Sequence, residues 1–303
     1  MGETERVQTV HSGLFARLVE IGRGAAEAAA PPETLYDRHG VLVVRVGDVV
    51  VKAHQDDREH GPRFLARIRL AGTLPELVLA PHDPPLTVDG RTVTIAPFGE
   101  PVDPSQELPW KEGGRLLAAL HSRSVPAEAP SWGRPTRVAR LVSRLGEGVA
   151  EDAVRRAFAT LPAWIRGVED EPPPRTERLI HGDWHLGQMV RAQDGHWRLI
   201  DIEDMGKGDP AWDLARPAAL YSAGVLPPDD WEQFLGAYTA AEGPAVPVQG
   251  DPWTSLDIPA RSLAIQIAAT CVISAGRDDR ALDGPEQAMI DACVRISAAG
   301  DAA

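Results

Sequence analysis

The sequence has few cysteines and no long apolar run. Its two cysteines, Cys271 and Cys293, lie far apart in Ala-rich surroundings typical of helices. This predicts two reduced, buried thiols rather than a disulfide framework or a metal site. The longest apolar stretch, Leu263 to Ala275, is interrupted by Gln266 and is too short to span a bilayer. The first residues show no basic-then-apolar signal segment. We therefore expect a soluble cytoplasmic protein with no membrane partner.

Basic residues are also scarce. The 303 residues contain 31 Lys and Arg against 44 Asp and Glu, which gives a net charge of −13. This balance argues against a nucleic-acid partner, because phosphate backbones demand basic surfaces. It is compatible with a cationic small substrate and equally with an ordinary acidic protein, so charge alone does not identify a ligand. The length allows one large domain or two lobes.

One loop carries the strongest chemical signal. It reads His181-Gly-Asp-Trp-His-Leu-Gly-Gln188, and Asp201 ends an apolar run shortly after it. The interval from Asp183 to Gln188 resembles the interval between the catalytic Asp and the metal-binding Asn of kinases. A carboxylate can take the proton of a hydroxyl while an amide oxygen and a second carboxylate hold Mg²⁺. We therefore assign Asp183 as the catalytic base and Gln188 and Asp201 as metal ligands.

Residues beside this set are further candidates. Glu203 points the same way as Asp201 if the strand persists, so it could contact the metal or the substrate, or be a solvated loop acid. His185 could touch the transferring phosphate. Trp184 and Trp212 could wall the pocket of the acceptor, or could belong to the core.

The N-terminal part changes from helical to strand periodicity. Residues 12–29 predict one amphipathic helix. The run 41–52, with Gly-Asp at its centre, predicts a β-hairpin that ends in Lys52. Such a lysine either is solvated or grips nucleotide phosphates, as the strand lysine of kinases does. A helix over 56–71 would offer Glu59 as the partner of Lys52, or as a first-turn carboxylate favoured by the helix dipole.

No G-x-G-x-x-G loop precedes the lysine, so a lid over the phosphates would have to be built differently, around Arg38-His39-Gly40. Residues 77–80 and 91–95 predict two further strands. If the segment after the second strand is a hinge, Phe98 is the backbone donor for an adenine, because Pro97 has no N–H. An ordinary strand-ending turn would look the same.

The rest of the chain predicts helices. Asp209 is a good N-cap with Pro210 in the first helical position, and Asp213 would hold the backbone of the loop from that helix. The other expected helices cover residues 110–121, 136–147, 151–166, 228–241, 256–276 and 284–298.

Several motifs together carry a family resemblance. The loop ending at Gln188, Leu-Ile-Asp201-Ile-Glu, Gly-Asp209-Pro-Ala-Trp-Asp213 and Leu117-Ala-Ala-Leu-His121 occur in that order. They resemble the aminoglycoside phosphotransferase and choline kinase superfamily, and the His-Leu-Gly-Gln variant is similar to actinobacterial maltokinases and glucosamine kinases.

The resemblance implies an α+β, bilobal protein-kinase-like fold. A small β-rich N-lobe would cover residues 1–97, and a larger, mainly helical C-lobe would cover residues 98–303. It also implies ATP or GTP as donor, Mg²⁺ and a small hydroxylated acceptor, in a monomer or homodimer.

The leading hypothesis is a kinase that phosphorylates a hydroxyl of an aminoglycoside-like or amino-sugar compound, for antibiotic resistance or metabolism. A kinase of a neutral sugar or another metabolite is the first alternative. The second is a nucleotide-binding pseudokinase that acts as a regulator, which Gln188 in place of Asn would suggest.

Overall fold

The protein forms two compact units. The structure is a computed structural model, and it describes residues 3–27, 30–38, 40–55, 61–133, 136–168 and 177–300, with side chains from residue 13 onward. The sheet unit consists of Met1–Ser105, Glu128–Pro130 and Gly187–Glu203. The helical unit consists of Gln106–Ala127, Ser131–Leu186 and Asp204–Ala303. The chain therefore passes between the units more often than a single boundary after residue 97 implies.

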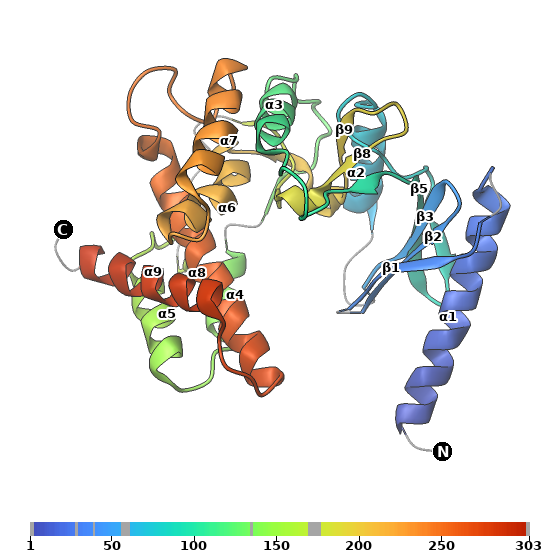
Figure 1. Cartoon of the computed structure of the whole chain (residues 1–303), viewed down its shortest axis with the longest axis horizontal. Coiled ribbons are helices and arrows are strands. Elements are labelled where there is room, and N and C mark those ends of the chain that lie inside the picture. The colour runs from blue at the N-terminus through green and yellow to red at the C-terminus, as the bar shows by residue number, and fades with distance from the viewer. Residues whose placement is uncertain are drawn as a thin grey trace. The chain divides into compact units, whose positions relative to one another are not determined.

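An antiparallel sheet of five strands forms the centre of the sheet unit (Figure 1), in the order β1-β2-β3-β5-β4. The strands span Glu33–Arg38 (β1), Val41–Val46 (β2), Val49–Ala53 (β3), Leu86–Val88 (β4) and Arg91–Pro97 (β5). Alternate residues of β2 and β3 are buried on one face, as period-two patterning requires. Gly47, with a φ of 60°, lies in the turn that joins them. The predicted hairpin is confirmed.

Helix α1, Glu3–Ala25, packs along this sheet against β2 and β3 (Figure 1). Leu14, Leu18 and Val19 share a buried cluster with the strand valines. A Cβ at Gly22 would lie 2.6 Å from Val46 Cγ2, so glycine allows the close approach of helix and sheet. The helix predicted over 12–29 begins and ends earlier than expected.

A second, three-stranded sheet explains why residues 187–203 belong to the sheet unit. Its order is β6-β8-β9, and the strands are Glu100–Pro101 (β6), Met189–Arg191 (β8) and Trp197–Leu199 (β9). The strand predicted over 77–80 is wrong, because Val78 makes only an isolated parallel bridge with Leu199. Helix α2, Pro62–Gly72, starts after Gly61 and is shorter than the predicted 56–71.

The helical unit holds most of the helices. They span Trp110–His121 (α3), Arg137–Val142 (α4), Val149–Ala159 (α5), Ala211–Ser222 (α6), Pro228–Ala240 (α7), Trp253–Arg277 (α8) and Gly284–Gly300 (α9). Strand β7, Arg178–Ile180, pairs antiparallel with β10, Gly206–Gly208. The helices expected over 136–147 and 151–166 end early, because glycines follow α4 and Pro162 follows α5.

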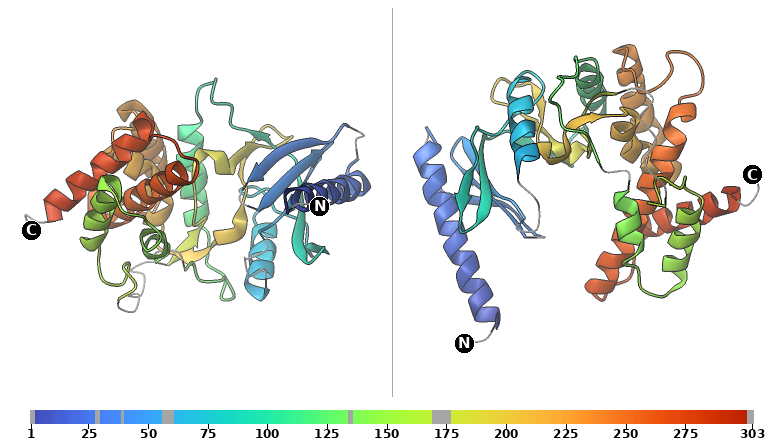
Figure 2. Two further views of the ribbon diagram at one scale, coloured as in Figure 1. Left: turned by 90° about the horizontal axis from the view of Figure 1, so that it is seen from below. Right: turned by 180° about the vertical axis from the view of Figure 1, so that it is seen from behind.

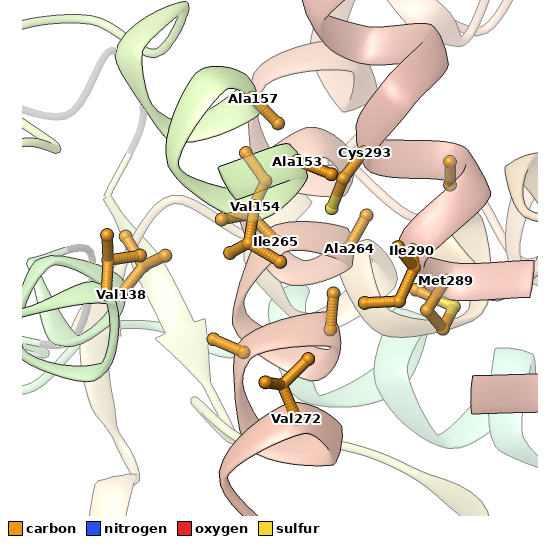
Figure 3. Packing of buried hydrophobic residues seen from close by; sticks show 14 of the residues in the cluster. Val138, Ala153, Val154, Ala157, Ala264, Ile265, Val272, Met289, Ile290 and Cys293 are labelled. Carbon is orange, nitrogen blue, oxygen red and sulfur yellow. The ribbon is translucent and has the colours of Figure 1, made fainter. Parts of the chain in front are cut away.

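Helix α8 belongs to the core of the helical unit. Both views of Figure 2 show it together with α5 and α9, and Figure 3 shows Ala264, Ile265 and Val272 among the buried side chains around it. Among the described residues, α8 alone is long and apolar enough to cross a membrane, by length and composition only. Half of its most apolar window is buried inside the protein. Mixed α and β elements in these two units confirm the predicted α+β class.

Candidate functional site

Lys52, near the end of β3, holds its ammonium between two carboxylates of the sheet unit. Its Nζ atom lies 2.7 Å from Glu203 Oε1 and 3.0 Å from Asp201 Oδ1. Strand alternation places Lys52 on the face opposite to the core that the sheet shares with α1. Burial alone would lower the pKa of Lys52, but the charges of Asp201 and Glu203 outweigh it and hold that pKa above its ordinary value. Lys52 is therefore a charged group held in a fixed position.

Glu203 is the more buried of the two partners, with its side chain only 9% exposed. Its Oε1 atom also lies 2.7 Å from His54 Nδ1, and His54 Nε2 lies 2.9 Å from Thr94 Oγ1. Burial lowers the pKa of His54 below its ordinary value despite the hydrogen bond to Glu203. The neutral ring then donates to the carboxylate and accepts from the Thr94 hydroxyl.

The ionised state of Glu203 is strongly favoured. Burial alone would raise the pKa of this carboxyl, but the hydrogen bond with His54 and the charge of Lys52 bring it well below its usual range. The sequence predicts Glu203 either at the metal or the substrate or as a solvated loop acid, whereas in the structure its carboxylate contacts Lys52 and His54. Glu203 therefore acts as a buried brace for the lysine.

The expected pairing of Lys52 with Glu59 stays a prediction. Glu59 lies outside the described residues, and α2 begins only after Gly61. Sequence reasoning missed His54 and Thr94. A usable signal was the spacing of two between Lys52 and His54, which puts both side chains on one face of an extended strand.

Gln188 and Asp201 lie together at the end of the hairpin formed by β8 and β9. Gln188 Nε2 donates to Asp201 Oδ2 at 3.2 Å, and the backbone carbonyl of Gln188 accepts the N–H of Ile200 at 2.9 Å. A half-turn of the Gln188 amide would exchange its nitrogen and oxygen and present the oxygen to the same space. The structure thus brings together the two residues predicted as metal ligands.

The donor set fits Mg²⁺ shared with a phosphate-bearing ligand. An amide oxygen and a carboxylate are hard oxygen donors, and the Asp201 side chain is 34% exposed and so reachable. In the described part of the chain, no group of three or more His, Cys, Asp or Glu residues is placed to hold a metal ion. Mg²⁺ commonly takes one or two protein carboxylates and completes its shell with water and substrate phosphates.

In the helical unit, Asp213 of α6 holds the backbone of the loop that carries Asp183. The fully buried carboxylate accepts the N–H of His181 at 2.6 Å and the N–H of Gly182 at 2.7 Å. This bears out the sequence-based role of Asp213. Gly182 has a φ of 87°, and a Cβ there would lie 2.5 Å from the carbonyl oxygen of Asp204. Glycine is therefore required where the chain turns toward Asp183.

Asp213 is itself held in place by a buried chain of hydrogen bonds. His121 Nε2 lies 3.0 Å from Asp213 Oδ2, and His121 Nδ1 lies 2.8 Å from the Tyr238 hydroxyl. The Tyr238 oxygen accepts the N–H of Ala245 at 2.9 Å, so its hydroxyl hydrogen is free to donate to His121. Burial raises the pKa of Tyr238 above its ordinary value, which keeps the hydroxyl protonated.

Asp183 itself lines a pocket of the helical unit. Its Oδ1 atom accepts a hydrogen bond from Arg216 Nη2 at 2.9 Å, and both side chains are about one quarter exposed. Trp132 and Trp212 line the same pocket, with their ring centroids 5.2 Å apart. The base predicted from the loop therefore lies in the lining of a pocket.

The sequence matches the Phosphotransferase enzyme family, APH, over residues 41–253, which is more than half of the chain. The chain belongs to this family. A comparison with curated protein sequences gives no significant match.

Solved structures resemble the phosphotransferase over nearly its whole length. A choline/ethanolamine kinase family protein from Mesorhizobium loti has a TM-score of 0.59 at 18% identity, covering 96% of this chain and 94% of that chain. A thermostable mutant of the aminoglycoside phosphotransferase APH(4)-Ia has a TM-score of 0.62 at 14% identity, with 91% and 97% covered. Spectinomycin phosphotransferase APH(9)-Ia, in complex with ADP and spectinomycin, has a TM-score of 0.58 at 14% identity, with 94% and 98% covered. These likenesses confirm the predicted kinase-like fold.

The tryptophans of the phosphotransferase divide into core and pocket. Trp184 is only 2% exposed and stacks on Phe234 at 4.9 Å, although it borders the pocket beside Asp183. Trp132, which sequence reasoning missed, fixes its ring by donating from Nε1 to the carbonyl of Gly182 at 3.1 Å. Trp132 and Trp212 are therefore better placed than Trp184 to wall a substrate.

Two further contacts are predicted, that of Phe98 with an adenine and that of His185 with a phosphate. The N–H of Phe98 donates to the carbonyl of Asp48 at 2.7 Å, and the Arg45 guanidinium lies 3.5 Å from the centre of the Phe98 ring. The N–H of Phe98, predicted to bind an adenine, is thus already hydrogen-bonded within the sheet unit. His185 is half-buried two residues after Asp183, and its contact with phosphate stays a prediction. His39, at the expected lid, lies outside the described residues.

Proposed function

We propose that this phosphotransferase moves the γ-phosphoryl group of ATP, or of GTP, to a hydroxyl of a small molecule. One observation carries the proposal: Lys52 converges with Asp201 and Gln188, which follow it by more than 130 residues, on one point of the sheet unit. A fixed cation beside hard oxygen donors is what the phosphates of a nucleotide with Mg²⁺ require. ADP is bound by the APH(9)-Ia neighbour, which supports nucleotide use here.

The reaction needs little covalent work from the protein. The acceptor oxygen forms a bond to the γ-phosphorus, the bond from that phosphorus to the β–γ bridging oxygen breaks, and the nucleoside diphosphate leaves. Asp183 orients the acceptor hydroxyl and takes its proton late in the transfer. Lys52 binds phosphate oxygens, and Gln188 and Asp201 would hold Mg²⁺. When bound, the ion neutralises charge that develops on the phosphates.

Glu203 and Asp213 support these groups without touching the substrates. The first holds Lys52, and the second fixes the backbone that precedes Asp183. Rigid placement of reacting groups is a large share of catalysis in phosphoryl transfer. The contact of Glu203 with Lys52 lies within the sheet unit, and that of Asp213 with the loop lies within the helical unit.

The acceptor is a hydroxylated compound, and two classes remain in view. An aminoglycoside-like or amino-sugar acceptor agrees with the net charge of −13 and with the spectinomycin bound by the APH(9)-Ia neighbour. A neutral sugar agrees better with the pocket, because the single carboxylate among its described lining residues, Asp183, is already paired with Arg216.

ADP release with ATP, Mg²⁺ and a panel of hydroxylated acceptors tests the proposal. We expect turnover with at least one acceptor class and a loss of about 10²- to 10⁴-fold in kcat for Asp183→Asn. Asp229→Asn, an exposed position in the first turn of α7, is the matched control and should keep full activity. Nucleotide binding without turnover of any acceptor would refute the kinase and favour a pseudokinase regulator.

A further inference from the structure

We propose that the pocket beside Asp183 selects an uncharged, polyhydroxylated ring, and that Arg216 and Ser262 determine this selectivity. The inference rests on the proposed function, because it specifies the acceptor of that same reaction. It departs from the amino-bearing acceptors that the overall charge of the chain would suggest.

The charges that line the pocket cancel. Among its described lining residues the only charged side chains are Asp183 and Arg216, and they form an ion pair at 2.9 Å. Recognition of a polyamine needs carboxylates in excess, since each ammonium must exchange its hydration shell for acceptors. Here an ammonium would meet a guanidinium beside the single carboxylate. The described lining of the pocket therefore carries no net negative charge, although the whole chain does.

Two tryptophans supply an apolar wall. The rings of Trp132 and Trp212 are tilted by 50° to each other, and Trp164 packs edge-on to Trp212 at 6.4 Å. The apolar C–H face of a sugar ring can lie on such an indole surface while its hydroxyls reach polar groups at the rim. Indole faces also attract cations. Arg216 opposes that second use, because it already places a positive charge in the pocket.

Unused hydrogen-bonding groups point to hydroxyls as the ligand groups. Among the described residues, Ser262 Oγ is buried without a hydrogen-bond partner, and so is Arg216 Nε. Serines 122 and 222, which are exposed, instead donate to the backbone carbonyls four residues earlier, as serines in helices commonly do. Gln266, one turn further along α8 than Ser262, lines the same pocket.

A site that offers neutral donors and acceptors together suits hydroxyl groups, which can both donate and accept. An unpaired buried hydroxyl is costly for the fold, so its retention is explained if a ligand completes its bonding. Substrates that fill such groups are strongly preferred over analogues that cannot. Ser262 is thus a specificity-determining residue of the acceptor site.

Steady-state kinetics on three matched acceptor sets test the inference. They are neutral mono- and disaccharides, the same sugars with one hydroxyl replaced by an amine, and polycationic aminoglycosides. We expect kcat/KM to be at least about tenfold higher for the best neutral sugar than for its amino counterpart. The KM of the neutral sugar should be independent of ionic strength, because no charge pair is screened.

Two substitutions make the test specific to the pocket. Ser262→Ala should raise the KM of the neutral sugar about five- to tenfold, leave kcat nearly unchanged and leave the melting temperature equal or higher, because it removes an unpaired buried hydroxyl. Ser274→Ala, on the same helix outside the pocket, should change none of these values. Arg216→Gln should reduce the ratio of kcat/KM for the neutral sugar to kcat/KM for its amino counterpart.

The outcomes separate this inference from the proposed function. Efficient phosphorylation of polycations, with neutral sugars poor, would overturn the inference and leave the kinase intact. A lower melting temperature and an unchanged KM for Ser262→Ala would also overturn it, since the serine would then be a structural residue. Failure to transfer phosphate to any set would remove the kinase and this inference together.

Discussion

Replacing Asp213 by Asn tests how the loop that carries Asp183 is held. The Asp213 carboxylate accepts two backbone N–H groups and the Nε2–H of His121 while fully buried. Asn keeps the shape but has one oxygen, so one of the two N–H groups of the loop would face an amide NH₂. An unsatisfied buried donor costs about 1–3 kcal/mol, and the remaining hydrogen bonds lose the contribution of the charge.

We therefore expect Asp213→Asn to lower the free energy of unfolding by about 2–4 kcal/mol, a large part of the 5–15 kcal/mol typical of a domain. Because the displaced backbone directly precedes Asp183, kcat should fall by about 100-fold, the cost of a shift of about 1 Å in a reacting group.

Urea unfolding and steady-state ADP release measure the two effects. Asp291→Asn, an exposed position on α9 whose carboxylate accepts from the Gln287 amide at 2.9 Å, is the control for loss of one charge. An Asp213→Asn protein within about 0.5 kcal/mol of the parent, with kcat unchanged, would show that the loop holds its own conformation.

Three further results are expected. Glu203→Gln should raise the KM for ATP about tenfold with a smaller effect on kcat, because Lys52 loses a charged hydrogen bond worth about one factor of ten. An unchanged KM for ATP would show that Glu203 does not hold Lys52 in place. Gly182→Ala should destabilise the protein by at least about 1–2 kcal/mol, the cost of a left-handed residue before any clash; thermal unfolding close to that of the parent would contradict it. Burial raises the pKa of Cys271 to about 11 and that of Cys293 to about 12, so at pH 8 roughly one thiol in a thousand or fewer is ionised. Ellman's reagent should therefore react slowly with the native protein and at once with the denatured chain, and rapid native labelling would disprove that burial.

Local patterns in the sequence predict the local parts of the site. The valine alternation and the Gly47 turn specify the hairpin that ends in Lys52, since both signals lie within a few residues. Asp213 lies 31 residues after Gly182, so its contact with the loop is long-range. The local part of that prediction is the start of its helix, where the Asp209 side chain accepts the N–H of Ala211. Such short-range relations need no knowledge of the tertiary fold.

The partner of Lys52 could not be predicted in the same way. His54 and Glu203 are separated by 149 residues and meet only after β3 and the segment that follows β9 fold into one unit. The sequence offers Glu59 as an alternative by analogy with the kinase helix, and nothing local ranks the two glutamates. Burial explains why Glu203 is paired, because a carboxylate that is 9% exposed must have cationic or donor partners.

Helix α6 carries both the residue that holds the loop before Asp183 and the residue that pairs with Asp183. Asp213 and Arg216 lie three residues apart and so on neighbouring positions of one helical face, where the first holds the loop backbone and the second pairs with Asp183. The position of the proposed base and the charge of the proposed acceptor pocket therefore depend on the same rigid element. A change at Arg216 alters the charge that an acceptor meets while Asp213 keeps the loop in place, because the Asp213 carboxylate is fully buried and Arg216 is one quarter exposed. Acceptor preference can thus change without loss of the phosphoryl-transfer geometry.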